Sequence, residues 1–176
     1  MRVDRFFTFS TGSPMKSFFV CAGIVLGIAL PSLSFAQVAV VQQPDHELLL
    51  AATDARLAAD KRLVYDFMRE VFEGGRMDLA DKYLAEGYIQ HNPNVATVRA
   101  GFVEAFSKWV KPKPIETKLK APLVAITAEG DLVILSFVRE GTDPKDATKK
   151  YTTTWFDMFR IEAGMIAEHW DPALKS

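Results

Sequence analysis

The sequence predicts an α+β protein in which helices come first and a strongly curved antiparallel sheet follows. Two observations lead to this fold class. Apolar residues between positions 46 and 109 recur at spacings of three, four and seven, which is the period of helices with one buried face. From position 116 onward they lie in short runs separated by turn-like Gly, Asp and Pro residues, which is typical of strands in a meander.

Residues 1–36 have the pattern of a secretory signal peptide. Lys16 precedes the apolar run 17–30, and small residues near Ala36 predict cleavage after that position. Met15, directly before the lysine, is a more natural start than the first residue. The run is short for a membrane span, which needs about 20 apolar residues. We therefore expect a periplasmic or secreted protein with no membrane attachment after cleavage; an uncleaved anchor is the alternative.

The remaining residues, 37–176, have a length that suits one domain. The only cysteine, Cys21, lies in the predicted signal peptide, so the exported chain would fold without disulfides. The formal net charge of the whole chain is −1, and no basic stripe is evident. This composition argues against a nucleic-acid partner.

Residues 37–59 are expected to form a leader and the beginning of a long helix. Asp45 is placed to cap this helix, which would run over 46–73 as one helix or as two in line. Gly74 and Gly75 would end it.

A shorter second helix is predicted over 77–84 and would be ended by Gly87. An extended segment, 88–91, follows and stops at Asn92 and Pro93. Thr97 is expected to cap a third helix that continues to Trp109.

Four strands are predicted in the rest of the chain, at 116–127, 132–140, 151–161 and 165–170. From Leu132 onward these strands carry large apolar residues on both faces. Both faces must therefore be covered, one by the helices and the other by a second subunit. We expect a homodimer.

The last two strands place Asp157, His169 and Asp171 among bulky apolar residues. A buried carboxylate costs several kcal/mol unless it is paired or protonated, so we expect these residues to have either a specific partner or a chemical role. Strand residues alternate between faces, which puts His169 and Asp171 on one face and Ile166 on the other. The purely structural alternatives are a solvated Asp171 after the last strand and an Asp157 held by a fixed partner such as Arg160 or His169.

The turn between these strands decides whether the three polar residues meet. With a three-residue loop, Asp157 lies across from His169 or diagonal to Asp171. With a two-residue loop it faces Trp170 instead. We expect the first arrangement because it brings the polar groups together.

His91 precedes an Asn-Pro pair and either caps a turn or reaches into a cavity mouth, where Asn92 could help it bind a carbonyl oxygen. His91, His169 and a carboxylate are also ligand types for iron or zinc, but their spacing is not that of a metal site, so we expect no metal. A glycine loop that would hold a phosphate is also absent, and we expect no cofactor. The exported chain contains neither a cysteine nor a Gly-x-Ser-x-Gly elbow for nucleophilic catalysis. The predicted substrate-binding residues are Tyr88, Asn92, Phe102, Phe106, Trp109 and Trp155.

Several motifs together resemble the SnoaL-like polyketide cyclases, in particular their predicted aldol-condensation branch, within the nuclear transport factor 2-like superfamily. The resemblance covers roughly residues 60–172, so we expect a SnoaL-like domain over 60–176. It rests on Tyr-Ile-Gln-His-Asn-Pro at 88–93, Gly101-Phe102 with Phe106, Gly-Asp-Leu-Val at 130–133, and the segments 156–162 and 168–171.

The resemblance implies a conical, usually dimeric α+β barrel around a deep apolar pocket. In the characterised cyclases an aspartate on the final strand is the acid/base of an intramolecular aldol closure that needs no cofactor. Asp171 falls at the similar position. The facing residue is often histidine in the cyclases, whereas Asp157 stands there in this chain.

Our first hypothesis is therefore an acid/base enzyme that acts next to a carbonyl of a small apolar molecule. Asp171 would be the base, His169 and His91 would stabilise the enolate oxygen, and Asp157 would set their protonation.

Two further readings stay open. One is a periplasmic protein that binds a small molecule without catalysis. The other is an isomerase or epoxide hydrolase of the same superfamily, which would need a tyrosine or arginine in the pocket; Tyr65, Tyr88 and Arg160 are the candidates.

Overall fold

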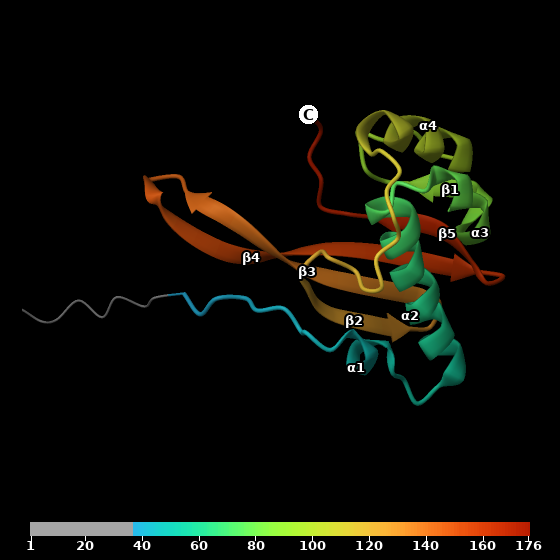
Figure 1. Cartoon of the computed structure of the whole chain (residues 1–176), viewed down its shortest axis with the longest axis horizontal. Helices are drawn as coiled ribbons and strands as arrows, with labels where there is room; N and C mark the ends of the chain where they lie inside the picture. The colour runs from blue at the N-terminus through green and yellow to red at the C-terminus, as the bar shows by residue number, and fades with distance from the viewer. Residues whose placement is uncertain (1–36) are drawn as a thin grey trace, which may run out of the picture. The chain divides into compact units, whose positions relative to one another are not determined.

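The computed structural model describes residues 37–176, in which all helices but α4 precede the strands (Figure 1). The predicted signal peptide, including Met15 and Cys21, lies outside the described residues. The elements are α1 (His46–Leu50), α2 (Ala55–Phe67), the π-helical turn η1 (Met68–Glu73), the 3₁₀ turn η2 (Met77–Leu79), α3 (Ala80–Tyr83), β1 (Leu84–Gln90), α4 (Arg99–Trp109), β2 (Leu123–Glu129), β3 (Leu132–Asp143), β4 (Asp146–Glu162) and β5 (Met165–Trp170). The predicted α+β class is confirmed.

The strands form one five-stranded sheet in the order β1-β5-β4-β3-β2. Strands β2 to β5 make the predicted antiparallel meander. Strand β1, predicted only as a short extended segment, joins the edge of β5 in parallel, with Gln90 beside His169. This pairing places the end of β1 next to the polar residues of β5.

The first helical region is two helices, each with its own cap. The Asp45 carboxylate accepts a hydrogen bond from the Glu47 amide at 3.1 Å, as predicted. The chain then leaves the helix after Leu50, and Asp54 caps α2 by accepting from the Arg56 amide at 2.7 Å. Side-chain acceptors at both starts satisfy amides that would otherwise lack a partner.

Two predicted helix boundaries are wrong. Gly87 lies inside β1, because the chain becomes extended directly after Tyr83. Thr97 does not cap α4, since its hydroxyl donates to the Tyr88 carbonyl at 3.2 Å and thereby ties the loop to β1. The helix begins after Val98, whose φ of 62° turns the chain into it.

The strand boundaries also differ from those predicted. β2 begins at Leu123 rather than at 116, while β3 and β4 are longer than expected. Their extra residues pair with one another, as Thr142 does with Lys150. Figure 1 shows this part of β3 and β4 continuing beyond the other strands as a two-stranded arm.

The core lies between the helices and one face of the sheet, and α2 crosses the strands in Figure 1. Phe67 of α2 packs with its ring against Tyr83, Phe102 and Phe159, at centroid distances of 5.7 to 6.0 Å. Rings at these distances and inclined to one another are in a favourable geometry. None of the helices within residues 37–176 is long and apolar enough to cross a membrane.

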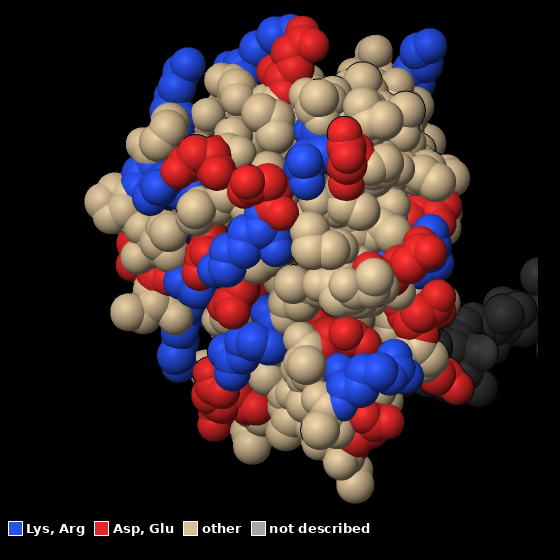
Figure 2. Space-filling view, turned by 90° about the vertical axis from the view of Figure 1, so that its right-hand side faces the viewer, with Lys and Arg blue, Asp and Glu red and all other residues tan. Residues whose placement is uncertain are grey.

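Acidic and basic side chains are mixed on one face of the molecule. On the face presented in Figure 2, lysine and arginine are interspersed with aspartate and glutamate. This view agrees with the low net charge of −1. The absence of a nucleic-acid partner stays a prediction.

Candidate functional site

A cavity of about 690 Å³ lies between the helices and the inner face of the sheet. Aromatic side chains from both the helices and the strands contribute to its wall. All six predicted substrate-binding residues line it: Tyr88, Asn92, Phe102, Phe106, Trp109 and Trp155. A cavity of this size with apolar walls suits a small flat molecule. The roles of these residues in binding stay predictions.

Asp157, His169 and Asp171 all line the cavity, although the turn between β4 and β5 is not the predicted three-residue loop. The turn has only two residues, Ala163 and Gly164, and both have positive φ, as in the favoured hairpin turns. Regular pairing from this turn would send His169 to the outer face.

A β-bulge at Ala167 prevents this outcome. Ile161 pairs with Ile166, whereas Arg160 pairs with Glu168, so that two residues of β5 oppose one of β4. After the bulge Phe159 faces His169. The expected opposition of Asp157 and His169 is therefore wrong, because the two residues are diagonal neighbours. Ile166 is also on the buried face, contrary to the simple alternation.

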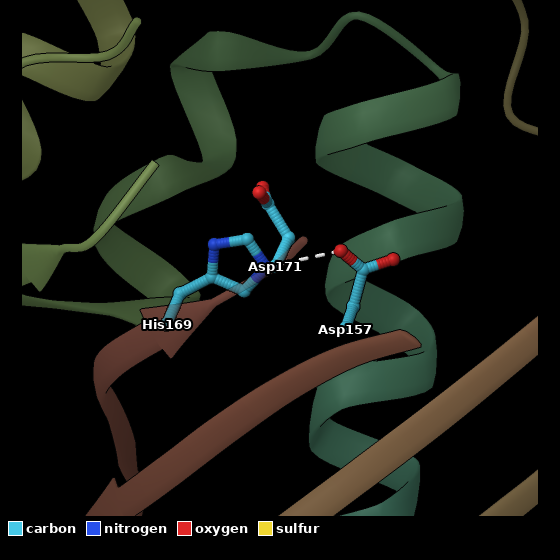
Figure 3. Close-up of side chains that lie close together, drawn as sticks. All are labelled: Asp157, His169 and Asp171. Carbon is cyan, nitrogen blue, oxygen red and sulfur yellow. Dashed lines mark hydrogen bonds and ion pairs between the residues drawn. The ribbon is translucent and has the colours of Figure 1, made fainter. Parts of the chain in front are cut away.

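The three polar side chains converge at the floor of the cavity, from β4, from β5 and from the residue after β5 (Figure 3). Their potential ligand atoms all lie within 4.8 Å of one another. His169 Nε2 is 3.2 Å from Asp157 Oδ1, and both residues are only 8% exposed. The Trp155 indole N–H donates to the same Asp157 oxygen at 3.3 Å. These contacts fix Asp157 against the imidazole.

Gln90 determines which nitrogen of His169 carries a proton. The Gln90 Oε1 atom accepts the Asn92 backbone N–H at 2.9 Å, and this contact fixes the orientation of the amide. The same oxygen is 2.9 Å from His169 Nδ1. Since an amide oxygen only accepts, Nδ1 must be the donor.

The remaining nitrogen, Nε2, faces Asp157, and a hydrogen bond between the two requires one shared proton. The pair can exist as imidazolium and carboxylate or as neutral imidazole and carboxylic acid. Such a pair can give up or take a proton at the cavity surface.

Asp171 is held by a different set of donors. The Asn92 side-chain amide donates to Oδ2 at 2.8 Å, and the Ala173 backbone N–H donates to Oδ1 at 2.8 Å. Asn92 thus positions Asp171. The sequence analysis had expected it to assist His91 instead. Each carboxylate oxygen keeps a further lone pair, so Asp171 remains able to accept a proton.

Tyr88 provides a hydroxyl beside the two carboxylates. Burial raises the pKa of Tyr88, and the negative charges of Asp171 and Asp157 raise it further. The hydroxyl accepts a hydrogen bond from Gln90 Nε2 at 3.0 Å. Within residues 37–176 it donates to no acceptor, so its proton can be offered to a bound molecule.

The family model of the SnoaL-like domain matches residues 64–169. The chain belongs to the SnoaL-like family. This membership, within the nuclear transport factor 2-like superfamily, confirms the resemblance found in the sequence. A search of curated proteins found no significant match.

Solved structures of similar fold include TsrD from Streptomyces laurentii, with 22% identity over 68% of this chain and 90% of that chain and a TM-score of 0.45. A provisionally assigned polyketide cyclase from Acidithiobacillus ferrooxidans has 19% identity over 69% and 89% of the two chains, with a TM-score of 0.46. An epoxide hydrolase of the LEH-like type from M. tuberculosis has 12% identity over 66% and 83%, with a TM-score of 0.45. At these identities the likeness concerns the fold alone.

In this SnoaL-like domain His91 does not reach the cavity. Its Nε2 lies 2.7 Å from a Glu168 oxygen, and its ring stacks on Trp170 at a centroid distance of 5.0 Å. Alternation along β1 explains the position, because Tyr88 and Gln90 face inward while Ile89 and His91 face outward. The bonds from His91 and then Arg160 hold the pKa of Glu168 below its usual range.

Two of the three candidates for an isomerase or hydrolase site also lie elsewhere. The Tyr65 hydroxyl is 2.8 Å from His46 Nδ1, away from the cavity, and Arg160 pairs with Glu168 on the outer face. Tyr88 is the one that lines the cavity.

Sequence reasoning missed Gln90 and Arg139, which also line the cavity of the SnoaL-like domain. Each could have been found from strand alternation, because Gln90 follows Tyr88 by two residues and Arg139 follows Phe137 by two.

Asp157, His169 and Asp171 are the residues that could hold a metal, since they supply one imidazole and two carboxylates. The bond from Nδ1 to Gln90 would leave Nε2 for the ion. Binding would require the bond between Nε2 and Asp157 to open. The expectation of no metal stays a prediction.

Proposed function

We propose that this SnoaL-like protein is a cofactor-independent acid/base enzyme. It acts next to a carbonyl of a small apolar molecule, by aldol condensation or cyclisation. The observation that supports this proposal is the cluster of Asp157, His169 and Asp171 at the floor of an apolar cavity. Such a site places a proton acceptor and a proton donor beside the same bound molecule.

In the proposed reaction Asp171 takes a proton from the carbon next to the carbonyl. The C–H electrons form a C=C bond, and the carbonyl electrons move to oxygen, which gives an enolate. Tyr88 donates a hydrogen bond to that oxygen, where the charge develops. Its hydroxyl is suited to this role because the pKa of Tyr88 is raised by burial and by the neighbouring carboxylates.

The second step forms the carbon–carbon bond. The enolate carbon bonds to the carbon of a second carbonyl, and the oxygen of that carbonyl takes the proton from His169 Nε2. Asp171 then returns its proton to the imidazole, so the site is restored. Asp157 orients the imidazolium before the transfer of the Nε2 proton, through its contact of 3.2 Å with that nitrogen.

The aromatic wall supports this chemistry in two ways. Phe102 and Phe106 lie with their ring centroids 4.3 Å apart and offer flat surfaces to a planar enolate. They also exclude water, which strengthens the interaction of the developing charge with Tyr88.

The experiment follows exchange of the α-hydrogens of 2-tetralone with deuterium from the solvent, by NMR. Asp171→Asn should lower the enzyme-dependent rate by roughly 10²- to 10⁴-fold, the usual contribution of a general base. Asp81→Asn is the matched control, because Asp81 is exposed on α3 and lies away from the cavity. An unchanged rate in Asp171→Asn would show that this residue is not the base.

A non-catalytic binding protein is the second candidate. It is favoured by the complete pairing of polar groups, since every buried side-chain nitrogen and oxygen in the described part of the chain has a hydrogen-bond partner. This reading predicts capture of a small molecule without conversion. Mass spectrometry of molecules that copurify with the protein, before and after incubation, distinguishes capture from turnover.

Assembly as a homodimer is part of the proposal. The outer face of the sheet carries apolar residues beside the Arg160–Glu168 pair, with Phe156 52% exposed and Ile134 paired beside Met158. A second copy would cover this face. Sedimentation equilibrium tests the mass, and Phe156→Glu should give a monomer if the sheet forms the interface.

We also propose export to the periplasm or the medium, on the basis of the sequence pattern of residues 1–36 alone. Fractionation of cells that produce the full chain, with the mass of the recovered protein, tests both export and cleavage.

A further inference from the structure

Arg139 lies where β3 leaves the helices, on the same face as Phe137 and at the edge of the cavity. Its guanidinium carbon is 4.4 Å from the centroid of the Trp155 ring, so the planar group rests on the indole. This contact holds the side chain while leaving its N–H donors uncommitted.

No carboxylate of the described chain forms an ion pair with Arg139. All the ion pairs and His–carboxylate contacts among residues 37–176 involve other basic residues. Arg139 is also the one arginine or lysine among the described residues that line the cavity. An arginine that is fixed by stacking and lacks an internal partner is prepared to bind an anion.

Apart from His169, which is paired with Asp157, the remaining charged side chains of the wall are carboxylates. Asp157 and Asp171 lie at the floor, and Glu73 accepts bonds from the backbone amides of Lys120 and Ala121. An anionic group of a ligand would be repelled from the floor and attracted to Arg139. The wall thereby defines one orientation for a molecule that carries an acid at one end.

We infer that the cavity takes a carboxylate-bearing aromatic or polycyclic carbonyl compound, with its carboxylate bound by Arg139. The inference rests on the proposed function, whose substrate class it specifies. The apolar body would lie along the aromatic wall, and the reacting carbonyl would point toward Tyr88 and Asp171. Trp155 joins the two ends, since its ring supports Arg139 and its N–H donates to Asp157.

The test measures binding of 2-naphthoate and of its uncharged methyl ester by isothermal titration calorimetry. Wild-type protein should bind the acid more tightly than the ester. Arg139→Gln should weaken binding of the acid roughly tenfold, as expected for a charge-assisted contact that water partly screens. It should leave the affinity for the ester within about twofold, because the apolar contacts are unchanged.

Two controls separate the local contact from general charge. Arg76→Gln removes the same charge from an exposed arginine that pairs with Asp78 away from the cavity, and it should change neither affinity. Arg139→Lys keeps the charge without the planar fork and should fall between wild type and Arg139→Gln. Binding of the acid should weaken at about 0.5 M salt, where screening is strong.

The outcomes distinguish this inference from the proposed function. If wild-type protein binds the ester as tightly as the acid, or if Arg139→Gln weakens both equally, the carboxylate assignment is wrong while a ligand cavity is retained. If neither probe binds, the proposed ligand cavity fails together with the inference.

Discussion

Replacing Gln90 by leucine tests the assignment of protons in the site. The change removes the oxygen that accepts His169 Nδ1–H at 2.9 Å and the amide that donates to the Tyr88 hydroxyl at 3.0 Å. Both partners are buried, at 8% and 1% exposure. The imidazole would then lose the contact that fixes its tautomer.

The expected cost in stability follows from these contacts. Each buried group left without a partner costs about 1–3 kcal/mol, so two such groups cost about 2–6 kcal/mol. Burying the leucine side chain returns about 1–2 kcal/mol. The free energy of unfolding should therefore fall by up to about 5 kcal/mol, measured by urea unfolding.

The decisive readout is ¹⁵N NMR of the His169 ring, which identifies the protonated nitrogen. Wild-type protein should show a protonated Nδ1, and Gln90→Leu should lose this fixed state. Gln90→Glu keeps an acceptor at the same place and serves as the matched variant, in which Nδ1 stays protonated. A wild-type spectrum with Nδ1 unprotonated, or no change in Gln90→Leu, would refute the assignment.

Three further predictions concern stability and metal dependence. Burial lowers the pKa of His46 from 6.5, so the unfolded chain takes up a proton before the folded chain as the pH falls. The stability that comes from the bond between His46 and Tyr65 is therefore complete above pH 6.5 and is lost below it. His46→Gln should reduce the difference in unfolding free energy between about pH 7.5 and about pH 5.5. Gly75→Ala should cost more than about 2 kcal/mol in urea unfolding, because a Cβ at this positive φ would clash with the Lys111 carbonyl, whereas Gly164→Ala, with open space at a similar φ, should cost only about 1–2 kcal/mol; equal losses would contradict the clash. Treatment with EDTA should leave the exchange of 2-tetralone unchanged, and a loss that Zn²⁺ or Mn²⁺ restores would show that the acidic cluster holds a metal.

The fold class and the common face of His169 and Asp171 could be predicted from the sequence, because residues two positions apart in an extended segment point to the same side. The register of β4 with β5 could not be derived from the sequence, since it depends on a β-bulge that no residue type predicts. The bulged residue is Ala167, and neither a glycine nor a polar residue marks the position.

His91 was assigned wrongly because its chemistry was considered before its position. Once Tyr88 faces the cavity, alternation sends His91 outward and Gln90 inward. A glutamine attracts less attention than a histidine, although here its amide fixes the protons of the site. Arg139 was missed because it lies near the end of the predicted strand 132–140, where a charged residue is expected to be solvated, whereas β3 continues to Asp143.

The bulge at Ala167 has a consequence for how relatives of this chain should be aligned. Removing Ala167 would let β4 and β5 pair regularly from the turn, with Phe159 still opposite His169, so the acidic cluster would keep its face. A relative shorter by one residue at this point can therefore possess the same constellation. An alignment that counts residues from the turn would shift its histidine and aspartate by one position relative to His169 and Asp171. Structural superposition would identify the equivalent residues correctly.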